Sequence, residues 1–213
     1  MAAVRSLVAA VALTATAVTL GVAVRGNGVV HVDAAAPARP GTPLSAYDTA
    51  SVVVQRSAFC SGLGPDAVAA ALGGAPASSS SYGNGQRAGL TPKLKDVAHE
   101  FSCSWHGADG AVARAWVFAP PVTPARARDL AAEALAARGC EPVRDAPAYG
   151  SPSAAAVCGS RRQLQASYRG LFGDAWLACS IAVPAPGPGR SELVDRTGRW
   201  CVEVARAASH LGG

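Results

Sequence analysis

Apolar and polar residues alternate along several stretches of the chain, a pattern typical of half-buried β-strands. The clearest example covers residues 97–105, where Phe101, Cys103 and Trp105 fall on one side and polar residues on the other. In the stretch 175–183 the odd-numbered residues are apolar and should face the core. Further strands are predicted over residues 51–55, 111–119, 154–158 and 163–170, with a short one around Val143.

Helix signals mark three other stretches, 65–72, 123–138 and 191–209. A proline in the first turn opens the first two, and Gly73 ends the first. Between the first helix and the strands, the Ser- and Gly-rich stretch 74–89 predicts a mobile surface loop. This order of elements predicts an α+β fold, with about three helices packed on one face of an antiparallel sheet.

The N-terminal part of the chain contains an uncharged, apolar stretch between Arg5 and Arg25. As a helix this stretch would be roughly 28 Å long, close to the thickness of the hydrocarbon core of a bilayer. We therefore expect residues 1–25 to form a single transmembrane anchor, with the N-terminus inside the cell and the domain outside. The alternative is a signal peptide cleaved near Ala34-Ala35-Ala36, which would secrete the domain.

The residues after this segment divide into a linker and one domain. Residues 26–45 are rich in Pro, Gly and Ala and predict an extended linker, and residues 46–213 suit a single extracytoplasmic domain. The apolar residues of the domain are mostly small, so its core needs reinforcement. All six cysteines lie in the domain, and their even number predicts three disulfides formed outside the cytoplasm.

The spacing of the cysteines leaves every pairing open, because six cysteines allow fifteen connectivities. We expect pairing in chain order, and each loop closed in this way would stabilise the fold by about 3 to 4 kcal/mol. The expected pairs are Cys60 with Cys103, Cys140 with Cys158, and Cys179 with Cys201. A zinc site is the rival interpretation, but the chain has no C-x-x-C pair. We predict no metal and no cofactor.

The net charge of +5 is mild for a chain of this length. The longest basic run is Arg161-Arg162, whereas nucleic-acid-binding proteins concentrate positive charge on one face or in runs. The charge therefore predicts a solvated, slightly basic surface and no nucleic-acid partner.

Side chains that could act as acid or base catalysts are sparse. Asp96, His99 and Glu100 form the densest titratable cluster, and a histidine near a carboxylate can act as a base. The competing interpretation is a partly buried strand histidine satisfied by a hydrogen bond. Because no nucleophile motif accompanies the cluster, we predict no catalytic residue and regard enzymatic activity as the less favoured interpretation.

The stretch 168–176 has the most distinctive composition in the chain. Its aromatic and charged side chains could line a ligand groove, or the aromatics could supply bulk to a core poor in large side chains. The residues of this candidate groove are Tyr168, Arg169, Phe172, Asp174 and Trp176.

Two short motifs carry a resemblance to a known group of proteins. Phe59-Cys60-Ser61-Gly62-Leu63 before a helix, followed by Cys103-Ser104-Trp105 in a strand, resembles the C-x-x-L and C-x-W pattern of uncharacterised actinobacterial cell-envelope domains. Many of those proteins are lipoproteins, whereas this chain lacks a lipidated cysteine. The resemblance implies an extracytoplasmic location and supports the pairing of Cys60 with Cys103; it implies no catalytic residue.

These observations favour a membrane-anchored, non-enzymatic extracytoplasmic domain that binds an envelope protein or peptide. One alternative is a secreted hydrolase or transferase that uses His99 with a carboxylate. Another is a structural subunit of an envelope membrane complex, whose anchor assembles with partner helices.

Overall fold

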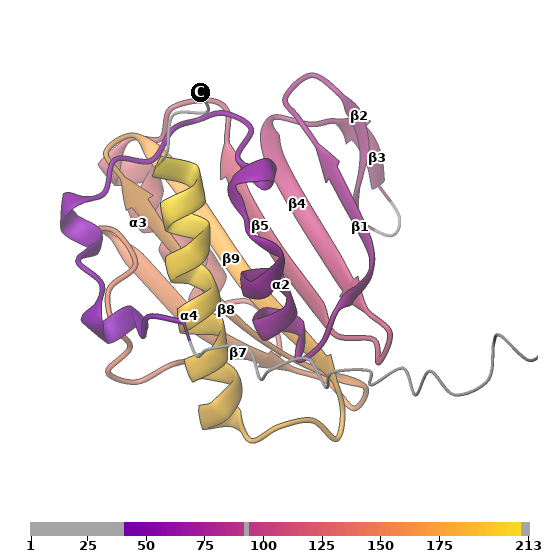
Figure 1. Ribbon diagram of the computed structural model, residues 1–213. Helices are drawn as coiled ribbons and strands as arrows, with labels where there is room; N and C mark the ends of the chain where they lie inside the picture. Colours follow the sequence, from indigo (N-terminus) through magenta and orange to yellow (C-terminus); the bar gives the residue numbers. More distant parts are fainter. Residues whose placement is uncertain (1–40, 92–93, 210–213) are drawn as a thin grey trace, which may run out of the picture. The chain divides into compact units, whose positions relative to one another are not determined.

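Seven antiparallel strands form the main sheet, in the spatial order β1-β4-β5-β9-β8-β7-β6 (Figure 1). The computed structural model describes residues 41–91 and 94–209. The strands of the main sheet are β1 (Pro76–Tyr82), β4 (Glu100–Gly107), β5 (Val112–Phe118), β6 (Cys140–Pro142), β7 (Ser153–Gly159), β8 (Gln163–Phe172) and β9 (Ala175–Pro184). A separate hairpin joins β2 (Arg87–Thr91) to β3 (Leu94–Val97).

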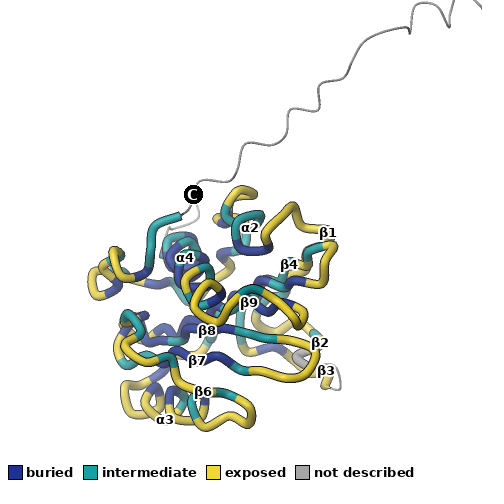
Figure 2. Tube along the Cα trace, turned by 90° about the horizontal axis from the view of Figure 1, so that it is seen from below, coloured by how far each residue is buried: buried dark blue, intermediate teal, exposed yellow. Residues whose placement is uncertain are grey.

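Three α-helices accompany the sheet: α2 (Pro65–Leu72), α3 (Pro124–Leu135) and α4 (Arg190–Ser209). The expected α+β class and antiparallel sheet are confirmed. Helices α2 and α4 cover one face of the sheet, which we call the covered face, whereas α3 lies on the other side (Figure 2). The expectation that the helices share one face therefore holds for α2 and α4 and not for α3.

Side-chain alternation explains why α3 finds a place on the second face. Phe172 and Leu177 belong to the core under α4, while their neighbours Leu171 and Trp176 point the other way. These two large side chains are apolar, so both sides of the β8–β9 turn region bury hydrophobic surface. Helix α3 packs its alanines against the second side.

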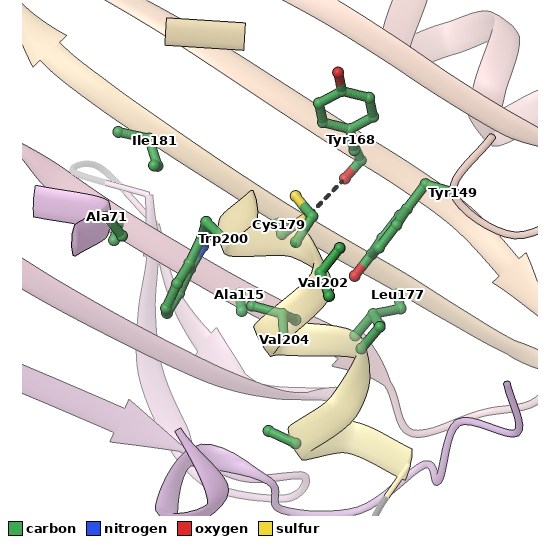
Figure 3. Close-up of a cluster of buried hydrophobic side chains, with 14 of the residues drawn as sticks. Ala71, Ala115, Tyr149, Tyr168, Leu177, Cys179, Ile181, Trp200, Val202 and Val204 are labelled. Atoms are coloured by element: carbon green, nitrogen blue, oxygen red, sulfur yellow. Dashed lines mark hydrogen bonds between the residues drawn. A yellow bond between two sulfur atoms is a disulfide. The ribbon is translucent and has the colours of Figure 1, made fainter. Parts of the chain in front are cut away.

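The covered face holds the larger core, which contains Trp200 of α4 and Cys179 of β9 (Figure 3). Cys179 forms a disulfide with Cys201 of α4 in this core. Leu177, Cys179, Ile181 and Val183 are all buried there, which confirms the parity expected for this strand. The three disulfides of the structure join the cysteines in chain order, as expected. They tie α4 to β9, β6 to β7, and the turn before α2 to β4.

The N-terminal predictions lie largely outside the described residues. Among residues 41–91 and 94–209, none of the helices combines the length and the hydrophobicity that a transmembrane span requires. The anchor or signal peptide predicted over residues 1–25 is not among these residues. Leu44, in the 3-10 turn η1 (Leu44–Ala46), is buried against the core, so the domain begins slightly before the expected boundary at 46.

Two local predictions are wrong. Residues 51–55 form no strand; a short 3-10 turn, η2 (Thr49–Ser51), leads instead into an irregular segment. The stretch 74–89 contains strand β1 and the start of β2 where a loop was predicted. Strand β1 is polar because it is an edge strand whose side chains are exposed, and it is held by its backbone ladder to β4.

Candidate functional site

The stretch predicted to form a groove, 168–176, is divided by the pleat of the sheet. Tyr168 and Phe172 are buried on the covered face, whereas Arg169 and Trp176 point to the opposite face. Asp174 lies in the β8–β9 turn and forms an ion pair with Arg56 at 3.2 Å. The five residues do not form one groove, although Tyr168 and Arg169 each line a separate cavity.

The larger of these cavities is a groove of about 470 Å³ on the covered side of the sheet, beside the first turns of α4. We call it the α4 groove. One wall is a single helical face carrying Ser191, Val194, Asp195 and Gly198. The other walls are η1, the loop 143–147 between β6 and β7, and the ring of Tyr168. Its volume lies in the range of small-ligand sites.

The walls of the α4 groove are fixed to the fold on every side. The disulfide between Cys140 and Cys158 closes the base of the loop, and Arg190 joins α4 to Glu141 of β6 at 2.7 Å. The segment around η1 is held to α4 because Arg206 donates to the Thr42 hydroxyl at 2.9 Å. The groove is therefore preformed.

The chemistry of the α4 groove is mixed. Leu44, Val143 and Val194 supply apolar surface, while Asp195 and Arg144 supply opposite charges. Burial raises the pKa of Tyr168, and the nearby Asp195 carboxylate adds to this shift, so the phenol stays protonated and can donate a hydrogen bond into the groove.

Two backbone features shape the lining of the groove. The glycine at position 198 lets α4 lie close to η1 and to Tyr168. A Cβ at this position would lie 3.3 Å from the Leu44 Cβ and 3.8 Å from the Tyr168 hydroxyl. Asp145, in the loop wall, has a φ of 54°, an unfavourable conformation that the surrounding structure must hold. A non-glycine residue in this conformation often marks a functional loop.

The smaller cavity, about 120 Å³, lies on the opposite face of the sheet, beyond the area that α3 covers. We call it the arginine pocket. Two small residues of β9, Ala178 and Ser180, lie between longer side chains of β5 and β8. Its lining includes Arg114, Trp116, Gln165, Ser167, Arg169 and Ser180.

The predicted acid/base cluster does not assemble. His99 is exposed in the turn before β4, and Asp96 accepts a hydrogen bond from the backbone amide of Val97. Glu100 accepts a hydrogen bond from the hydroxyl of Tyr82, whose pKa is raised by burial and by this bond. Neither His99 nor the two carboxylates line the α4 groove or the arginine pocket. These three residues therefore supply no acid or base to either cavity.

No three His, Cys, Asp or Glu side chains among the described residues lie close enough together to hold a metal ion. Comparison with known protein families and with curated proteins finds no match to this chain. The resemblance to actinobacterial envelope domains therefore stays a prediction.

Proposed function

We propose that the protein is a membrane-anchored, non-enzymatic extracytoplasmic domain that binds a short peptide segment of the cell envelope in the α4 groove. The observation that carries the proposal is the groove itself, whose lining combines apolar side chains with side chains of both charges. An extended peptide offers the same combination: apolar side chains, backbone hydrogen-bonding groups and charged ends or side chains.

The three disulfides support an extracytoplasmic location, because such bonds persist in oxidising compartments. The uncharged N-terminal stretch of the sequence supports an anchor of the kind expected from its length. Rigid groove walls favour binding, since a ligand loses less free energy when no loop has to be ordered.

Site-specific photocrosslinking in the native membrane tests the groove. A photoreactive phenylalanine replaces Ser191, which lines the groove, or Glu192, which is exposed on the same helical turn and does not line it. We expect peptide adducts from position 191 and none from position 192. Equal labelling from both positions, or no labelling from position 191, would contradict the proposal.

Charge-neutral variants refine the assignment. Asp195→Asn removes a charge from the groove wall, and Asp129→Asn removes one from the exposed surface of α3. We expect the first to weaken binding of the captured peptide by about tenfold, as for a hydrogen bond to a charged group, and the second to leave binding unchanged. The peptide should be recovered with its mass unaltered; a cleaved or modified peptide would favour the enzyme alternative.

A further inference from the structure

The arginine pocket contains two cationic side chains and lacks a carboxylate in its lining. None of the ion pairs among the described residues includes Arg114 or Arg169. Burial lowers the pKa of Arg169, and no neighbouring carboxylate opposes the shift. A half-buried guanidinium without a counter-charge is unfavourable unless a ligand supplies one.

The strand order explains how the pocket is built. Ser180 of β9 pairs with Arg114 of β5 on one side and with Ser167 of β8 on the other. Arg169 lies two residues further along β8, beside Ala178. Since neighbouring strands are about 4.8 Å apart, the long arginine side chains can reach the same space above the two small residues of β9.

The donors of the pocket match one class of ligand. The pocket is too small for a drug-sized molecule, and five of the residues that line it have side chains that can donate hydrogen bonds: Arg114, Gln165, Ser167, Arg169 and Ser180. Two positive charges balance a doubly charged group, and guanidinium groups bind phosphate oxygens with paired hydrogen bonds.

We propose that the arginine pocket is a second binding site, separate from the α4 groove, and that it binds a doubly charged oxyanion of the phosphate-monoester type. The group can belong to a soluble molecule or to a lipid headgroup. Arg169 and Arg114 carry the charge recognition, and the serine hydroxyls fix the orientation of the remaining oxygens. This site does not depend on what the α4 groove binds.

Calorimetric titration of the full chain in a neutral detergent tests the pocket, at constant ionic strength and with inorganic phosphate as the probe. We expect saturable binding that Arg169→Gln and Arg114→Gln each weaken by at least about tenfold, as for the loss of a charge-assisted hydrogen bond. Arg128→Gln is the matched control, because Arg128 is exposed on α3 and forms none of the ion pairs among the described residues. Binding by the control should stay within about twofold of wild type, since exposed charges are screened by salt.

A second variant separates loss of the site from loss of the fold. Ala178→Leu fills the floor of the pocket and keeps both arginines, so it should abolish phosphate binding while circular dichroism and the thermal transition show a folded protein. No saturable binding by wild type would overturn the proposal. Binding that survives Arg169→Gln or Ala178→Leu at wild-type strength would overturn it as well.

Short-chain phosphatidic acid is the second probe and distinguishes the two sources of the group. Tighter binding of this lipid than of inorganic phosphate, lost in Arg169→Gln, assigns the pocket to a lipid headgroup. Equal or weaker binding of the lipid assigns it to a soluble phosphate compound. Either result supports the site, provided that it depends on Arg169.

Discussion

The two faces of the sheet are built from the same strands but differ in how deeply their side chains are buried. On the covered face, β5 contributes Ala113, Ala115 and Val117, all fully buried under the helices. On the opposite face the same strand contributes Arg114 and Trp116, which are only half-buried. The covered face contains the larger core, whereas the opposite face keeps polar groups accessible where α3 does not reach. The comparison predicts that mutations in the core of the covered face mainly change stability, and that mutations in the arginine pocket mainly change phosphate binding.

The largest expected effect on stability comes from removing the disulfide between Cys179 and Cys201. These two cysteines are 2% and 0% exposed. Replacing both with alanine should lower the free energy of unfolding by about 5 kcal/mol, because loop closure and buried packing are lost together. The matched pair Cys140 and Cys158 closes a loop of similar length between half-buried residues, and its removal should cost about 3 kcal/mol. Denaturant unfolding measures both values; equal losses would contradict the contrast in burial.

Replacing a tryptophan by phenylalanine on each face of the sheet should give the next largest difference in stability. Trp200 is 2% exposed, and its indole nitrogen donates to the backbone carbonyl of Arg114 at 3.2 Å. Trp200→Phe should therefore lower the free energy of unfolding by about 3 kcal/mol, because it leaves a cavity and removes this hydrogen bond. Trp116→Phe, on the half-buried side, should cost less than about 1 kcal/mol. Thermal unfolding of the two variants in one buffer measures both losses of stability. A larger loss for Trp116→Phe than for Trp200→Phe would contradict the prediction.

Sequence patterns predicted the parts of the fold in which local signals agree with the final packing. The alternation of Leu177, Cys179, Ile181 and Val183 marked a strand whose core-facing side is the one expected. Strand β1 could not be predicted in this way, because its run of serines has neither apolar alternation nor strong β-propensity. Its backbone ladder with β4 forms the strand, and such long-range pairing leaves no mark in the sequence of β1 itself.

The two cavities were harder to predict than the fold. The composition of the stretch 168–176 suggests one ligand groove, but neighbouring residues of a strand point to opposite faces. Tyr168 and Arg169 therefore line different cavities. The remaining polar residues of the arginine pocket come from β5, β8 and β9, and they meet only because β9 lies between the other two strands. The order of strands in a sheet differs from their order in the chain, and no short motif encodes it here.

A buried tyrosine of the covered face gives a smaller effect in the opposite direction. The hydroxyl of Tyr149 is buried and has no hydrogen-bond partner among the described residues. Burial raises the pKa of Tyr149 well above its usual value, so the phenol remains neutral. Tyr149→Phe should raise the free energy of unfolding by about 1 kcal/mol, because it removes an unsatisfied polar atom and keeps the ring.

Packing around this ring makes the Tyr149 variant a clean test. The ring contacts Phe172 edge-to-face, with 5.0 Å between centroids, and Gly170 gives the Tyr149 backbone the room it needs. Tyr149→Leu is the control that removes the ring as well as the hydroxyl, and it should be destabilising. A stability loss in Tyr149→Phe, measured by chemical denaturation, would show that the hydroxyl does have a partner.

The smallest expected effect on stability belongs to the opposite face and has a functional counterpart. Arg169 is half-buried without a carboxylate beside it, so Arg169→Met should raise the free energy of unfolding by about 0.5 kcal/mol in phosphate-free buffer. Added phosphate should reverse the order, because it stabilises a wild-type protein that binds it and leaves the variant unchanged. Thermal unfolding of both proteins with and without phosphate, at equal ionic strength, measures the crossover. If Arg169→Met is destabilising in both buffers, Arg169 stabilises the sheet. That result would contradict the prediction that this residue of the opposite face mainly affects binding.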